Sequence, residues 1–67
     1  MILGRIKCYF EARGYGFIED NDGREVYFHL SVVEGVQTGT IRDGASVYFD
    51  VISTGIGLEA FKVRVMG

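Results

Sequence analysis

The sequence predicts a small antiparallel β-barrel of about five short strands. Ten glycines and no proline occur in a chain of 67 residues, and β-branched and aromatic residues cluster between the glycines. This pattern is typical of short strands joined by tight turns, and it does not indicate a long helix. A chain of this length has room for one modest core, so we expect a single domain over residues 1–67.

The strands are expected where β-branched and aromatic residues are densest, at Leu3–Phe10, Tyr15–Asp20, Glu25–Leu30, Ala45–Ser53 and Leu58–Val65. Between the second and third of these, the pair Asp22-Gly23 supplies the positive φ that a tight hairpin turn requires. Those two strands are therefore predicted to be antiparallel neighbours. Gly55 and Gly57 predict a second hairpin between the last two strands.

The segment from Ser31 to Asp43 is predicted to be a loop that crosses the barrel, because it is polar and is interrupted by Gly35 and Gly39. Ser31 is a suitable cap for one short helical turn over residues 32–34.

The charge balance argues against a protein that binds duplex DNA mainly by neutralising phosphates. Nine acidic residues against seven basic residues give a formal net charge of −2. The lone Cys8 can form no internal disulfide and suits a reducing compartment. The chain also shows no signal peptide and no apolar run near the ~20 residues of a membrane span, so we expect a cytoplasmic protein without a membrane partner.

Strand alternation sorts the side chains into a core face and an outer face. The residues expected in the core are Ile6, Ile18, Val26, Phe28, Val47, Phe49, Val51, Val63 and Val65. The same alternation places Tyr15 and Phe17 of one strand, and Tyr27 and His29 of the next, on the opposite face. Nine aromatic residues are more than so small a core needs, so we expect these rings outside.

Exposed rings on adjacent strands predict a binding site for unpaired bases. An apolar patch on a small domain commonly marks a binding site, and each stacked base contributes ~1–3 kcal/mol. The alternative is that the rings line a second layer, or cover a surface that nothing binds. A single sheet curled into a barrel has only one core face, which favours the binding site.

Two basic residues and two glycines lie beside the predicted rings. Lys7 and Arg13 are placed to meet the phosphates between stacked bases. Gly14 and Gly16 are expected to let the backbone approach the ligand closely and to leave the neighbouring rings unshielded.

Two motifs make the chain resemble a known family. Residues 13–18 read Arg-Gly-Tyr-Gly-Phe-Ile and resemble the K-G-F-G-F-I motif of the bacterial cold-shock proteins. Residues 26–31 read Val-Tyr-Phe-His-Leu-Ser and resemble the V-F-V-H-F-S motif of the same family. Residues 4–7 are similar to its opening strand, and residues 44–49 to its G-Q-x-V-x-F segment. The resemblance covers essentially the whole chain.

This resemblance implies a five-stranded barrel of the oligonucleotide-binding class (the OB-fold) that stacks the bases of single-stranded RNA or DNA. It implies no catalysis and no cofactor, and the family's usual role is that of an RNA chaperone. Carried over by position, the nucleic-acid-binding residues are Lys7, Tyr9, Arg13, Tyr15, Phe17, Tyr27, His29 and Leu30.

Several positions depart from the family pattern and predict weaker or altered binding. Cys8 stands where the family carries a tryptophan, and Leu30 stands where it carries a phenylalanine. The loop around Thr38 lacks an aromatic residue that the family often has, and Ile56 occupies a position where a basic residue is common. Phe10 is a candidate for a displaced ring that offsets these losses.

Phe61 lies on the same alternation as Val63 and Val65, so we expect it in a repacked core. The alternative is that Phe61 is exposed and forms, with Tyr48 and Phe10, a contact to a second copy of the chain.

Other functional classes find less support in the sequence. His29 and Cys8 are too few for a catalytic constellation or for the four ligands of a structural zinc site, so we expect neither an enzyme nor a metal site. The alternative to nucleic-acid binding is a small-barrel module for protein interaction or self-association. We expect a monomer or a weak homodimer.

Overall fold

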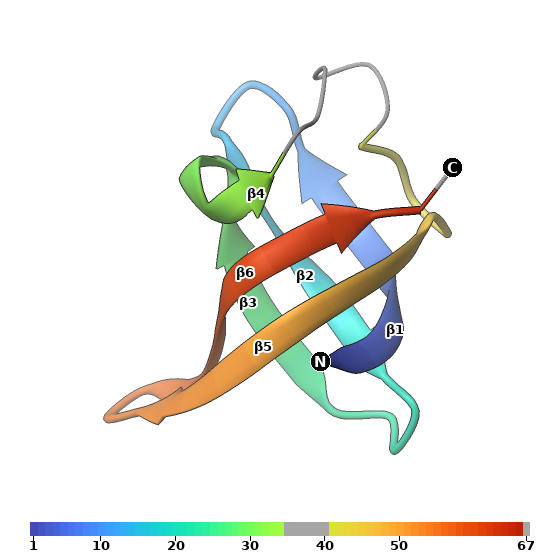
Figure 1. Cartoon of the computed structure of the whole chain (residues 1–67). Coiled ribbons are helices and arrows are strands. Elements are labelled where there is room, and N and C mark those ends of the chain that lie inside the picture. Colours follow the sequence, from blue (N-terminus) through green and yellow to red (C-terminus); the bar gives the residue numbers. More distant parts are fainter. Residues whose placement is uncertain (35–40, 67) are drawn as a thin grey trace.

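The computed structural model describes residues 1–34 and 41–66, which form strands that close into a barrel (Figure 1). The strands are β1 (Ile2–Phe10), β2 (Tyr15–Asp20), β3 (Glu25–His29), β4 (Val33–Glu34), β5 (Ser46–Thr54) and β6 (Gly57–Val65). A single 3₁₀ turn, η1 (Leu30–Val32), lies between β3 and β4 in this part of the chain. The predicted all-β barrel of OB-fold type is confirmed, and the five expected strands begin and end within one residue of the predicted positions. The two-residue strand β4 was not predicted.

The strand order is β3-β2-β1-β5-β6-β4, and an additional pairing of β3 with β6 closes the sheet. Consecutive neighbours from β3 to β6 in this order are antiparallel, whereas β6 pairs in parallel with β3 and with β4. The closing β3–β6 pairing is the single bridge from Tyr27 to Glu59. Figure 1 shows the long β5–β6 hairpin crossing in front of β1, β2 and β3, with its tip extending beyond the barrel.

The turn after β3 differs from the sequence prediction. The helical turn spans Leu30–Val32, and its N-cap is His29 rather than Ser31. The Nδ1 atom of His29 accepts the backbone N–H of Ser31 at 3.1 Å and lies 2.9 Å from the Ser31 hydroxyl. Val33 and Glu34, which were expected in the helical turn, form the strand β4 instead, where they pair with Val63 and Arg64 of β6. The middle of the predicted crossing loop, residues 35–40, lies outside the described residues.

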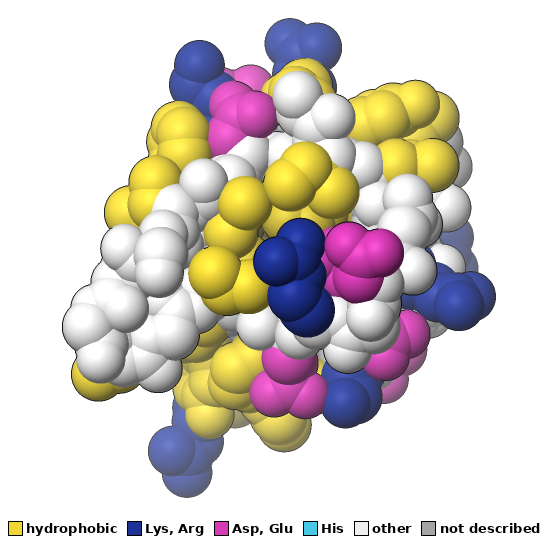
Figure 2. All heavy atoms as spheres, turned by 90° about the horizontal axis from the view of Figure 1, so that it is seen from below, with side chains coloured by type: hydrophobic (Ala, Val, Ile, Leu, Met, Phe, Trp, Pro, Cys, Tyr) yellow, Lys and Arg dark blue, Asp and Glu magenta, His cyan; other side chains and the backbone are white. Residues whose placement is uncertain are grey.

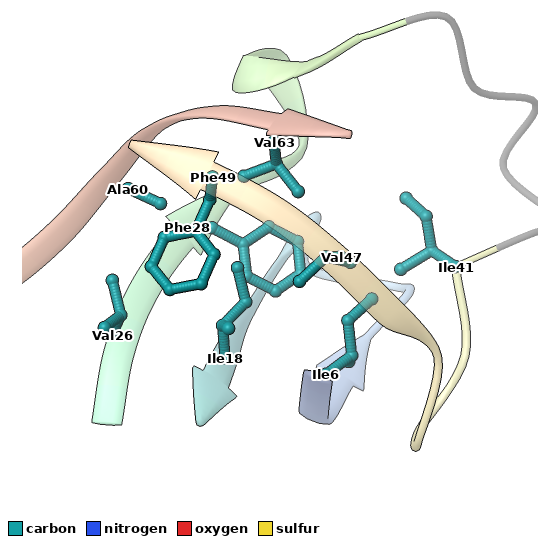
Figure 3. Close-up of a cluster of buried hydrophobic side chains, with 9 residues drawn as sticks. All are labelled: Ile6, Ile18, Val26, Phe28, Ile41, Val47, Phe49, Ala60 and Val63. Carbon is teal, nitrogen blue, oxygen red and sulfur yellow. The ribbon is translucent and has the colours of Figure 1, made fainter. Parts of the chain in front are cut away.

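The core is one cluster of nine buried hydrophobic side chains, Ile6, Ile18, Val26, Phe28, Ile41, Val47, Phe49, Ala60 and Val63 (Figure 3). Phe28 and Phe49 lie in the middle of this cluster. The predicted core residues are confirmed except Val51 and Val65, which are half-buried and pack against the cluster. Ile41 and Ala60 were not predicted. Within the described residues, no helix is long and apolar enough to span a bilayer.

Two β-bulges explain why simple alternation fails at both ends of the barrel. In β1 the pairing with β2 shifts between Ile6 and Cys8. The pairing of β6 with β5 shifts as well. Val51 of β5 pairs with Ala60, but the preceding residue, Asp50, pairs with Lys62, so Phe61 is the extra residue in β6. A bulge moves every residue beyond it to the opposite face. The expectation that Phe61 is buried is therefore wrong, and its side chain is 44% exposed.

Gly16 serves the packing of the barrel rather than the approach of a ligand. It is buried, and a Cβ atom there would overlap the Cys8 carbonyl oxygen and lie 3.0 Å from a ring carbon of Phe28. The interpretation of Gly16 as a ligand-approach residue is therefore wrong. Gly14 has a φ of 73° and closes the turn before β2, where its N–H donates to the Phe10 carbonyl at 2.9 Å.

The β2–β3 hairpin is organised by the buried carboxylate of Asp20. Gly23 has the predicted positive φ, 81°, and its N–H donates to the Asp20 carbonyl at 3.1 Å. The Asp20 side chain accepts the backbone N–H groups of Asp22 and Arg24 at 2.9 and 2.8 Å, and the Nε of Arg24 at 2.9 Å. These hydrogen bonds, foremost that from the Arg24 backbone, lower the pKa of Asp20.

Gly16→Ala is expected to destabilise the chain by roughly 1–3 kcal/mol, because the new methyl group meets backbone that cannot move without opening the β1–β2 ladder. Gly55→Ala is the control, since a Cβ there has no atom within 4 Å. Urea unfolding of both variants measures the difference. Equal stability of the two variants would contradict the packing role of Gly16.

The lowered pKa of Asp20 predicts a stability that depends on pH. The ionised carboxylate stabilises the fold above the ordinary Asp pKa of about 3.9, and this contribution is lost as the pH falls through the lowered pKa of the folded state. Asp20→Asn should therefore be less stable than the original chain at pH 7, and the difference should shrink below about pH 4. The control is Asp22→Asn, because Asp22 is exposed and its carboxylate lies 3.5 Å from Arg24. Urea unfolding at pH 7, 5 and 3 tests this, and a difference for Asp20→Asn that persists at pH 3 would contradict it.

Candidate nucleic-acid interface

The register of β1, β2 and β3 sorts the outer face of the sheet into rows, because residues paired across two strands point to the same side. One row contains Phe10, Tyr15 and His29, and the next contains Cys8, Phe17 and Tyr27. The third row is charged and contains Arg5, Glu19 and Glu25. We call the five residues Phe10, Tyr15, Phe17, Tyr27 and His29 the aromatic surface.

The rings of the aromatic surface contact one another without being buried. The centroid of Tyr15 lies 5.1 Å from that of Phe10, 5.7 Å from that of Tyr27 and 6.1 Å from that of Phe17. Phe17 and Tyr27 meet edge to face at 6.0 Å, with an angle of 70° between their planes. Edge-to-face contact supports each ring and leaves ring faces open. Tyr15, Phe17 and Tyr27 are half-buried, whereas Phe10 and His29 are exposed.

Tyr9 does not lie on the aromatic surface, contrary to the sequence prediction. It pairs with Gly16 on the inner side of the sheet, and its ring stacks at 6.0 Å and 15° on the buried Phe28. Its hydroxyl is buried and has no hydrogen-bond partner among the described residues. The bulge at Lys7 causes this change, because it turns Tyr9 inward and Phe10 outward. Phe10 therefore lies on the outer face, where the sequence suggested a displaced ring.

The predicted basic residues differ in how free their charges are. Lys7 donates from Nζ to Oε2 of Glu25 at 2.8 Å, and this hydrogen bond together with the Glu25 charge raises the pKa of Lys7. Arg13 is exposed in the turn before β2, and its guanidinium makes no ion pair with the described residues. Arg13 is therefore the more available of the two for a phosphate.

Leu30 and His29 connect the aromatic surface to the turn that follows it. The Leu30 side chain is half-buried against the core, and its N–H donates to the Gly14 carbonyl at 2.8 Å. Nδ1 of His29 is engaged by Ser31, so Nε2 is the ring nitrogen left for a ligand.

Charges of both signs are interspersed on the surface rather than separated. Arg24 pairs with Asp20, and Arg64 lies 3.4 Å from Glu34. Figure 2 shows Lys and Arg side chains next to Asp and Glu at the lower end of the barrel, with exposed hydrophobic side chains around them. Such a surface offers phosphates little net attraction. Within the described residues, no three His, Cys, Asp or Glu side chains gather as metal ligands.

A groove of about 590 Å³ extends the aromatic surface toward the β5–β6 hairpin. Its lining residues are Phe17, Glu25, Tyr27, Thr54, Ile56, Gly57, Leu58 and Glu59. Sequence reasoning missed Thr54, Leu58 and Glu59, because their approach to Tyr27 depends on the pairing of β3 with β6. A second hollow, of about 370 Å³, is lined mostly by polar and charged residues, among them Arg5 and Glu19, and by none of the aromatic rings.

A closed OB-type barrel with a cluster of rings outside its second and third strands defines a nucleic-acid-binding barrel. The family model described as "'Cold-shock' DNA-binding domain" matches residues 2–66. The chain is 36% identical over 63 residues to the cold shock-like protein CspLB of Listeria monocytogenes, covering 94% of this chain and 96% of that protein. It is 32% identical to the cold shock protein CspB of Bacillus caldolyticus, with the same coverage of both chains. It is also 35% identical over 65 residues to the cold shock-like protein CspA of Rickettsia typhi, covering 96% of this chain and 93% of that protein. The chain belongs to the cold-shock domain family.

Proposed function

We propose that this chain binds single-stranded RNA or DNA by stacking unpaired bases on the aromatic surface. The observation that carries the proposal is the set of four mutually supported rings, from Phe10 to Tyr27, outside a core that does not need them. Each base stacked on an aromatic ring contributes ~1–3 kcal/mol, and the contact tolerates different bases because every base has a π-face.

The other residues of the site have secondary roles in this proposal. Arg13 contacts a phosphate, and Nε2 of His29 donates a hydrogen bond to a base or sugar. Cys8 lies in the same row as Phe17 but offers no ring, so the stacking row begins at Phe17. Because stacking on the rings accepts any base, it can hold strands apart and melt weak secondary structure, which is the activity of an RNA chaperone.

The alternative, a module for self-association, finds one supporting observation in the exposed Phe61. Phe61, Tyr48 and Phe10 do not form a common patch, however. Tyr48 pairs with Leu3 at the start of β1, whereas Phe10 ends that strand seven residues later, roughly 20 Å away. The rings that do gather in one place are those of the aromatic surface.

The first test of the proposal compares a short single strand with its duplex. Stacking requires unpaired bases, so a labelled pyrimidine-rich heptamer should bind more tightly than the same sequence in a duplex, as measured by anisotropy.

The same titrations test the dependence on salt. With Lys7 and Arg13 as the expected phosphate contacts, the affinity should fall only about tenfold between 50 and 200 mM salt. Equal affinity for the duplex, or a loss of 10³-fold or more over this salt range, would contradict stacking as the main source of affinity.

The second test separates the two faces of β2. Phe17→Ala should weaken single-strand binding by ~1–3 kcal/mol and leave most of the stability, because the ring lies on the outer face. Ile18→Ala should lower the stability by ~2–5 kcal/mol, because Ile18 is fully buried. Thermal melts and binding titrations of both variants measure the effects. If Phe17→Ala lowers the stability but leaves the single-strand affinity of the folded protein unchanged, the site lies elsewhere.

A further inference from the structure

Glu59 continues the stacking row on the outer face. Tyr27 pairs with Glu59 across the β3–β6 seam, and Glu59 pairs with Ile52 of β5. The next residue, Ala60, points inward and is buried, which places Glu59 on the same face as Tyr27. Because neighbouring strands lie about 4.8 Å apart, a base stacked on Tyr27 brings its edge to the Glu59 carboxylate.

The groove next to Tyr27 is acidic and apolar, and none of its lining residues is a Lys or an Arg. Of its two carboxylates, Glu25 is engaged by Lys7, whereas Glu59 is half-buried and makes no hydrogen bond or ion pair with the described residues. The rim carries Ile56, whose side chain is fully exposed. Such a groove repels phosphate, and it suits a flat apolar ligand with hydrogen-bond donors along one edge.

An ionised carboxylate accepts hydrogen bonds and cannot donate, so it discriminates among the bases. Guanine presents two adjacent donors, N1–H and the N2 amino group, which match the two carboxylate oxygens. Cytosine and adenine present one amino group next to a ring-nitrogen acceptor, and in uracil and thymine the single N3–H lies between two carbonyl oxygens. Guanine is therefore the best complement to Glu59.

We propose that Glu59 makes this groove a guanine-selective subsite, in which the base stacks on Tyr27 and donates from N1 and N2 to the carboxylate. The proposal rests on the single-strand binding proposed above. The side chain of an arginine from a protein partner has similar complementarity to rings and a carboxylate. The base is favoured because the groove is continuous with the aromatic surface, so a strand stacked on Tyr15 and Phe17 delivers its next base there.

The test uses labelled heptauridylates in which a single guanine replaces uridine at each of positions 2 to 6. The wild-type chain should bind the best guanine-containing heptamer roughly 5- to 100-fold more tightly than the all-uridine strand, the range for a bidentate contact to a base. Inosine at the same position, which lacks the N2 amino group, should lose a large part of this gain. These comparisons use the wild-type chain and do not depend on the folding of a variant.

The matched variants are Glu59→Gln and Glu19→Gln. A Gln side chain has one acceptor oxygen and one NH₂ donor group, and the NH₂ group would face one of the two donors of guanine. Glu59→Gln should therefore bring the ratio of guanine to uridine affinity close to one. Glu19→Gln removes a carboxylate from the same outer face but outside the groove, and it should keep the ratio. Anisotropy titrations measure the ratio for each folded variant, with thermal melts as the check on folding.

The outcomes separate this inference from the function on which it rests. Failure to bind any of the single strands would overturn the proposed function itself. Tight binding of all strands without a guanine preference, or a preference that survives Glu59→Gln, would overturn the subsite alone. Competition by the peptide Gly-Arg-Gly that disappears in Glu59→Gln, without any guanine preference, would assign the groove to a protein partner instead.

Discussion

The site depends on one constraint, which is that only the inner face of a single closed sheet can line the core. On β2 the inward positions are Gly16 and Ile18, which pair with Phe28 and Val26 of β3. Alternation then leaves Tyr15 and Phe17 no position except outside. Three of the four Phe and Tyr rings of the aromatic surface, those of Tyr15, Phe17 and Tyr27, are consequences of how β2 and β3 fill the barrel. These three rings remain only half-buried on the outer face, and a cluster of such rings outside the core commonly marks a binding site.

The two bulges adjust this constraint locally, and they mark the limit of what the sequence predicts. The strands and most of the core are predictable because glycines bound β-rich segments and alternation holds within each of them. An extra residue in a strand has no such signal here, because neither Lys7 nor Phe61 is a residue type typical of a bulge. Tyr9 and Phe61 are the residues that lie on the side opposite to the one expected from the family motif or from alternation.

The part of the site that the sequence predicts is the part in which a short turn sets the pairing of two neighbouring strands. Tyr15, Phe17, Tyr27 and His29 lie together because the short turn at Gly23 fixes the pairing of β2 with β3. Glu59 joins them through a parallel bridge between residues 27 and 59, which no turn specifies. That bridge exists only because the barrel closes, so its partner residues follow from the tertiary structure and not from any local pattern.

The electrostatics of the chain then determine what kind of binding the rings can give. Lys7 is held by Glu25, so Arg13 is the basic side chain beside the aromatic surface that is left to meet a phosphate, and the formal net charge of the chain is −2. Stacking on three or four rings contributes several kcal/mol in total, from which the cost of ordering a flexible strand must be subtracted. For the proposed complex this predicts weak binding and fast exchange. In such a complex one added hydrogen-bonded contact changes the occupancy of a sequence far more than it would on a highly basic surface, because little non-specific affinity competes with it. A carboxylate at the end of the stacking row is therefore placed where a single side chain can determine which sequences the barrel prefers.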